Sequence, residues 1–159
     1  MLRSWFWQRR MHKLQKKFCR ENFPLQSALI LTDNPDIPDE SFLVKFSSVT
    51  GIEKAEIEIV FVDKAEHPRF FDLQPKQMDF WGNIKDQNIR KLFQRPGLLL
   101  LDLMRHDTLF KTLVSVHGSP AFRIGIDERP DLFDLVIVQP SFSGDEFLTE
   151  LEKYWHSLT

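Results

Sequence analysis

The stretch LLLLD at residues 98–102 decides the fold that this sequence predicts, and LMRHDTLFKTLVSVHG follows it at residues 103–118. Four consecutive leucines closed by an aspartate are typical of a strand buried on both faces, because a half-exposed strand alternates apolar and polar residues. From Asp107 to His117 the apolar residues recur at helical spacing, and Gly118 suits a helix end. A buried strand that leads directly into a helix indicates a parallel sheet with helical crossovers.

The same two kinds of element alternate on either side of this unit. Apolar runs bounded by turn residues predict strands at 28–31, 55–62, 121–126 and 135–138. Apolar residues at helical spacing predict helices from Pro38 to Gly51, from Asp86 to Gln94 and from Gly144 onward. The stretch 64–82 is irregular, and a short strand is predicted near Met78–Phe80.

This alternation predicts an α/β fold for residues 25–159. A chain of 159 residues, 42% of them hydrophobic, has the size and composition of one domain. We expect a small three-layer Rossmann-like sandwich with a mostly parallel sheet of about five strands, covered by helices on both faces. A basic amphipathic helix at residues 1–22 precedes this domain.

The N-terminal helix carries the main charge asymmetry of the chain. Residues 2–21 contain no Pro or Gly, and Trp7, Met11, Leu14 and Phe18 recur on one helical face. Seven of the 21 basic residues lie within residues 1–20, where there is no acidic residue. The other 14 basic residues stand against 23 acidic ones, so the rest of the chain has a net charge of about -9.

A basic helix with an aromatic face suits three kinds of partner: an anionic membrane surface, the phosphates of an RNA, and an acidic groove on a protein. It equally suits a fourth setting, in which the helix packs on the acidic body of its own chain. The sequence leaves these alternatives open. The predicted partner-binding residues are Arg3, Trp7, Arg9, Arg10, Lys13, Lys16, Lys17 and Arg20.

Polar residues at the predicted strand ends are the candidates for catalysis, because ligands of open parallel sheets bind beyond the carboxyl ends of the strands. These candidates are Asp33, Asp63, Asp102 and His106. Converging carboxylates could act as a base or hold a cation, and His106 could titrate near neutral pH. The competing interpretation is that the aspartates only form turns and helix caps.

No metal or cofactor is predicted. The single cysteine, Cys19, has no Cys or His at the spacing of a zinc site. No glycine-rich phosphate-binding motif follows the first strand, and the loop there, TDNPDIPDE at 32–40, is acidic and would repel a phosphate.

The lone cysteine and the lack of an apolar leader segment favour a cytoplasmic protein that is at most peripheral to the inner membrane. The aromatic stretch 70–81 is a candidate surface for homodimerisation.

Four stretches together resemble a family of short Bacteroidota α/β proteins defined by a domain of unknown function. They are the basic N-terminal helix, MDFWGNIKDQNIRKLF at 78–93, LLLLDLMRHDTLFKTLVSVHGSPAFRIGIDER at 98–129 and DLFDLVIV at 131–138. The resemblance implies the fold and no activity. Residues 102–125 also resemble the N-terminal Rossmann-like half of heptosyltransferase-type glycosyltransferases, which implies a sheet topology and no catalytic residue.

The sequence therefore favours a non-enzymatic interaction module whose basic helix docks on an anionic partner, either a membrane surface or an RNA-protein assembly. The alternative hypothesis is a small hydrolase or transferase that uses the acids at the strand ends.

Overall fold

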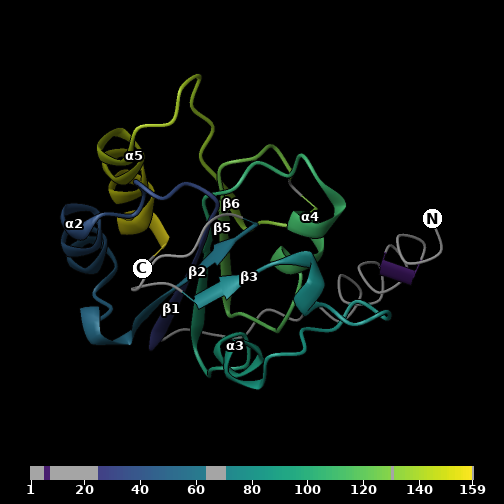
Figure 1. The fold of residues 1–159 in the computed structure, drawn as a ribbon. Helices are drawn as coiled ribbons and strands as arrows, with labels where there is room; N and C mark the ends of the chain where they lie inside the picture. The colour runs from purple at the N-terminus through teal and green to yellow at the C-terminus, as the bar shows by residue number, and fades with distance from the viewer. Residues whose placement is uncertain (1–5, 8–24, 64–70, 130, 159) are drawn as a thin grey trace.

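Parallel pairing joins all the strands of one sheet, in the order β3-β2-β1-β4-β5-β6 (Figure 1). The computed structural model describes residues 6–7, 25–63, 71–129 and 131–158. The strands are β1 (Ser27–Thr32), β2 (Ile57–Val62), β3 (Phe71–Leu73), β4 (Leu98–Asp102), β5 (Phe122–Gly125) and β6 (Leu135–Val136). The helices are α2 (Glu40–Thr50), α3 (Gln87–Leu92), α4 (Leu109–Ser115) and α5 (Gly144–Leu158), with short 3-10 turns η1 (Lys54–Glu56) and η2 (Pro75–Gln77).

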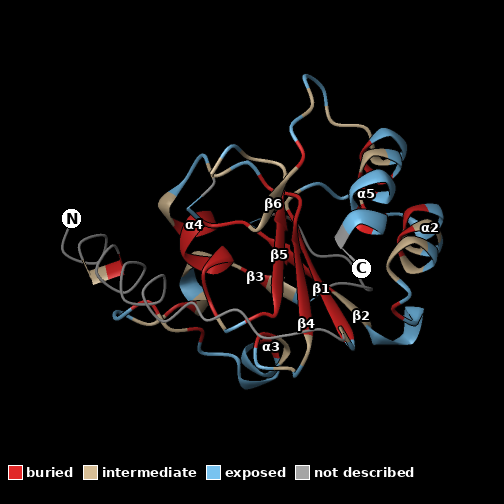
Figure 2. Cartoon of the chain, turned by 180° about the vertical axis from the view of Figure 1, so that it is seen from behind, coloured by how far each residue is buried: buried red, intermediate tan, exposed pale blue. Residues whose placement is uncertain are grey.

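The two central strands, β1 and β4, are buried along their whole length. Alternate residues of each strand point to opposite faces, and each face carries its own apolar core. Leu29 and Leu100 pack with α3 and α4, whereas Ile30 and Leu101 pack with α2 and α5. The result is the three-layer sandwich seen in Figure 1, with the buried sheet at its centre in Figure 2.

Each crossover helix begins at a polar residue that caps its free backbone amides. The Asp39 carboxylate accepts from the Phe42 amide at the start of α2, and the Asp86 carboxylate accepts from the amides of Asn88 and Ile89 in α3. Thr108 caps α4 by accepting from the Lys111 amide. These caps explain why turn residues recur between the apolar runs of the sequence.

The predicted α/β fold, with helices on both faces of a mostly parallel sheet, is confirmed, but the sheet has six strands in the described residues instead of about five. The additional strand is β3, which pairs with β2 at the sheet edge. The prediction of a short strand near Met78–Phe80 was wrong, because Met78 forms only an isolated antiparallel bridge to Ile84. Three residues, FDL, are too few to show a period in the sequence.

Most of the predicted N-terminal helix lies outside the described residues. Phe6 and Trp7 are described, and both are helical. No helix in the described part of the chain is both long and apolar enough to cross a membrane.

The Gly125→Ala substitution should destabilise the fold. A Cβ atom at Gly125 would lie 2.4 Å from the ring of Phe133, which is itself buried. We expect a loss of about 1–3 kcal/mol in the free energy of unfolding, the usual cost of overpacking a core.

Urea denaturation of the full chain measures this loss. The matched control is Gly144→Ala, because a Cβ atom there would lie 3.1 Å from its nearest neighbour, the Phe42 ring. Equal stability of the two variants would contradict the packing of Phe133 on β5.

Candidate functional site

The strand order reverses between β1 and β4. From β1 the chain continues to α2 on one face of the sheet, and from β4 it continues to α4 on the other face (Figure 1). The two connections diverge, which is the usual position of a ligand crevice in such a sheet. A pocket of about 230 Å³ lies here, lined by Thr32, Asp33, Asn34, Ile37, Leu103, Arg105, Asp107, Ile126 and Phe142.

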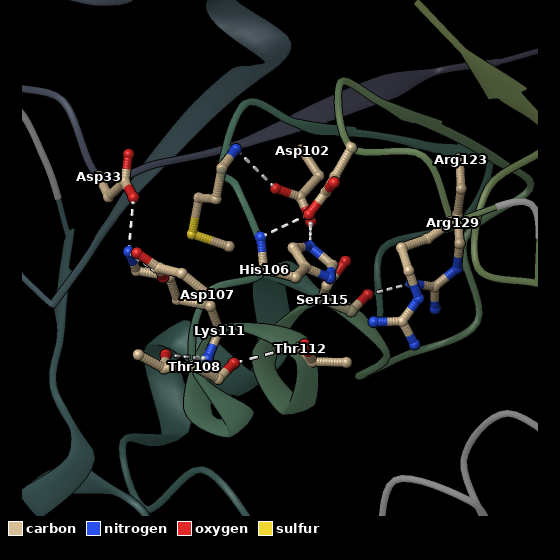
Figure 3. Close-up of polar contacts among 12 residues, drawn as sticks. Asp33, Asp102, His106, Asp107, Thr108, Lys111, Thr112, Ser115, Arg123 and Arg129 are labelled. Atoms are coloured by element: carbon tan, nitrogen blue, oxygen red, sulfur yellow. Dashed lines mark hydrogen bonds and ion pairs between the residues drawn. The ribbon is translucent and has the colours of Figure 1, made fainter. Parts of the chain in front are cut away.

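Lys111 joins the ends of β1 and β4 at the edge of this pocket. Its Nζ atom lies 2.8 Å from the Asp33 carboxylate and 2.8 Å from the Asp107 carboxylate (Figure 3). Burial alone would lower the pKa of Lys111, but hydrogen bonds and charge interactions with Asp107 and Asp33 outweigh it, so the pKa is raised. The ammonium is therefore charged at neutral pH and holds both carboxylates in place.

Asp102 and His106 form a second pair, closed off from solvent. The His106 Nε2 atom lies 2.7 Å from the Asp102 carboxylate, and both side chains have 0% exposure. Asp102 also accepts from the Met104 amide, and Asp127 accepts from the His106 amide at 2.7 Å. The pair thus fixes the backbone between β4 and α4, the segment that carries Arg105 and Asp107.

Arg123 supplies the positive charge of the core next to this pair. Burial lowers the pKa of Arg123 to about 10, although the charges of Asp102 and Asp134 act to raise it. The guanidinium stays protonated at neutral pH and donates to the backbone carbonyl of Ser115 (Figure 3) and to that of His117. It thereby ties β5 to the end of α4.

The structure brings three of the four predicted strand-end residues together at the carboxyl ends of the two central strands. Asp102 and His106 contact each other, and Asp33 follows the neighbouring strand β1. Asp63 follows β2, which is two strand spacings, roughly 10 Å, from β4. It is exposed, adopts a positive φ of 64°, and makes no hydrogen bond or ion pair with the other three among the described residues.

Sequence reasoning missed Lys111 and Arg123. The four-residue spacing of Asp107 and Lys111 is a signal of an ion pair on a helix, although α4 begins only at Leu109. No sequence signal marks Arg123, because a lone arginine within the strand FRIG looks like an exposed residue.

The Asp102–His106 pair has the components of a general base but lacks access. The His106 Nδ1 and Ser115 Oγ atoms are buried without a hydrogen-bond partner among the described residues, and the structure shows no hydrogen bond between them. The described residues include no group of three His, Cys, Asp or Glu side chains that could hold a metal ion. In this arrangement the pair supports the loop of the pocket.

A second candidate region lies where the N-terminal segment meets the domain. Trp7 is only 6% exposed, its ring centroid lies 6.0 Å from that of Phe110, and its indole nitrogen donates to the Asp79 carbonyl. Phe6 lies next to it, with its ring centroid 4.8 Å from Phe80 and 4.6 Å from Trp81. Trp7 thus packs on the α/β domain of its own chain, which is the fourth of the settings considered for the N-terminal helix.

The other predicted partner-binding residues lie outside the described residues. These are Arg3, Arg9, Arg10, Lys13, Lys16, Lys17 and Arg20.

Comparison with known proteins places the chain in a family. Residues 3–158 match the model described as a family of unknown function (DUF6913). The chain belongs to this family. No curated protein and no solved structure matches it. Membership of DUF6913 assigns no activity, and the two regions described above are the candidate functional sites of the chain.

The turn that holds Trp7 depends on the charge of Asp79. Its carboxylate accepts from the amides of Trp81 and Asn83 and from the Asn83 side chain. Burial alone would raise the pKa of Asp79, but these hydrogen bonds, those from Asn83 first, outweigh it and lower the pKa below 3.8. A lowered pKa stabilises the fold above pH 3.8, and this contribution is lost as the pH falls through the folded-state value.

We therefore expect Asp79→Asn to lower the free energy of unfolding at neutral pH by about 1–2 kcal/mol, as for hydrogen bonds to a charged group. The difference from the unsubstituted chain should shrink below pH 3.8, where that chain also begins to lose the charge. Urea titrations at neutral and acid pH measure it. A difference that stays constant or grows in acid would contradict the role given to the carboxylate.

Proposed function

We propose that this DUF6913 chain is a non-enzymatic interaction module that docks on an anionic membrane surface through its N-terminal end. The observation that carries the proposal is an aromatic patch, defined as Phe6, Phe80 and Trp81, that remains partly open beside the anchored Trp7. Phe80 is 43% exposed and Trp81 is 57% exposed. The cytoplasmic face of an inner membrane would be the corresponding location.

Aromatic rings and cations together suit a membrane interface. Trp side chains favour the headgroup region, where the ring is partly buried and its N–H group stays hydrated. Arg3, Arg9 and Arg10 lie within three residues of Phe6 or Trp7 in the sequence. Each basic residue near an anionic surface contributes about 1 kcal/mol to binding.

The buried Trp7 changes the form of this proposal. Its indole is already used by Asp79 and Phe110, so the docking contacts come from the aromatic patch and the basic side chains. Trp7 then serves as the anchor that holds its neighbour Phe6 in the patch. The burial of Trp7 is therefore compatible with docking on a membrane.

The alternative, a small hydrolase or transferase, draws on one contact, that between Asp102 and His106. The pair is inaccessible, Asp63 makes no hydrogen bond or ion pair with the other three among the described residues, and Asp33 is ion-paired to Lys111. Of the four residues, Asp33 alone lines the pocket between β1 and β4. The resemblance of residues 102–125 to heptosyltransferase-type enzymes adds a topology without a reacting group.

Vesicle co-sedimentation tests the membrane proposal. The full chain should bind vesicles of phosphatidylglycerol and phosphatidylcholine at low salt, and binding should weaken in high salt. The double substitution Arg9→Glu and Arg10→Glu should weaken binding by at least about 30-fold, since the two arginines alone contribute roughly 2 kcal/mol.

Trp81→Ala should weaken vesicle binding several-fold. The matched control is Tyr154→Ala, because Tyr154 is also exposed but lies on α5, whose apolar residues pack on the opposite face of the sheet. Equal binding to neutral vesicles, or equal loss in the two variants, would overturn the proposal. Binding to a poly(U) oligonucleotide without vesicle binding would replace the membrane with RNA, and a dimer in light scattering that Trp81→Ala dissociates would replace it with a second copy.

A further inference from the structure

The pocket between β1 and β4 is separate from the aromatic patch. Its apolar lining, Ile37, Leu103, Ile126 and Phe142, belongs to the core on the α2 and α5 side of the sheet. Trp7 belongs to the core on the α3 and α4 side. A ligand in the pocket therefore lies outside the surface proposed for membrane docking.

One side chain that lines the pocket, Arg105, carries a positive charge that no described residue pairs with. Its guanidinium makes no hydrogen bond or ion pair with another described residue. The loop that carries Arg105 is fixed on one side by the Asp102–His106 pair and on the other by the Thr108 cap of α4. Arg105 is exposed, and a guanidinium beside a pocket suits a carboxylate, which it can bind through two parallel hydrogen bonds.

The carboxylate of Asp33 can bind a positively charged group of the same ligand. Asp33 lines the same pocket, its side chain is 22% exposed, and only its Oδ2 atom bonds to Lys111. The same ammonium also serves Asp107, so its charge is shared between two carboxylates. The Oδ1 atom of Asp33 can accept from a ligand ammonium.

The size and the apolar lining limit the rest of the ligand. A cavity of about 150 Å³ is sufficient for benzene, so about 230 Å³ accommodates a side group of that size together with a small charged head. Ile37, Leu103, Ile126 and Phe142 would contact that side group.

We propose that this pocket binds an α-amino acid with an apolar side chain. Arg105 binds the carboxylate, Asp33 accepts from the ammonium, and the apolar lining covers the side chain. Lys111 is a positioning residue, since it fixes Asp33 and Asp107 without facing the ligand. This site does not depend on the proposed membrane function.

Leucine and phenylalanine are the probes for this site, together with two fragments of leucine. The fragments are 4-methylpentanoate, which lacks the amine, and 3-methylbutylamine, which lacks the carboxylate. Titration of the ¹⁵N-labelled full chain should give saturable shifts at millimolar leucine or phenylalanine, with the largest changes at residues 32–37, 103–107 and 142. Each fragment should bind at least about tenfold more weakly, because it loses one charged hydrogen-bond contact.

Arg105→Ala should weaken amino acid binding by about tenfold to a hundredfold, and Asp33→Asn should weaken it less, because the amide keeps an acceptor. The control is Arg90→Ala, an exposed arginine on α3 at the other face of the sheet. Thermal unfolding of each variant shows that it is folded. No saturable shift with either amino acid, equal binding of 4-methylpentanoate, or equal loss with Arg90→Ala would overturn the proposal.

Discussion

Parallel pairing of β1 with β4 is the constraint on which the rest of the structure depends. In its register Leu31 pairs with Asp102, so Asp33 and the 103–107 loop follow neighbouring strands side by side at the carboxyl end of the sheet. The chain leaves these two strands toward opposite faces, and neither connection closes the space between their ends. The pocket, the Lys111 ion pairs and the buried Asp102–His106 pair all follow from this placement.

The sheet also separates the two regions that carry the functional proposals. The amino acid pocket opens beside the core of α2 and α5, and the aromatic patch lies beside the core of α3 and α4. Their supports differ as well. Buried polar pairs hold the loop of the pocket, whereas the turn organised by Asp79 and the ring of Phe110 hold Trp7. Because they share no side chain, each region can be altered without changing the other.

The fold was predictable where local patterns and burial agree. The leucines of β4 have a clear sequence signal, and Asp39 and Asp86, which cap α2 and α3, lie at the predicted beginnings of those helices. The edge strand β3 was not predictable, because its three residues gain their conformation from pairing with β2. The position of Asp33, Asp102 and His106 near the sheet edge was predictable from strand order, but their accessibility was not. Which carboxylate meets Lys111 and which meets His106 depends on distances between residues far apart in the sequence.

The backbone hydrogen bond from the Leu103 amide to the Leu31 carbonyl tests the central pairing most directly. It is the last hydrogen bond between β4 and β1, at the point where the connections to α4 and α2 begin to diverge. In solution, a scalar coupling across this hydrogen bond, between the Leu103 amide nitrogen and the Leu31 carbonyl carbon, should be observed by NMR, with slow exchange of the Leu103 amide proton. A coupling to another carbonyl, or exchange as fast as in an unstructured peptide, would contradict the account.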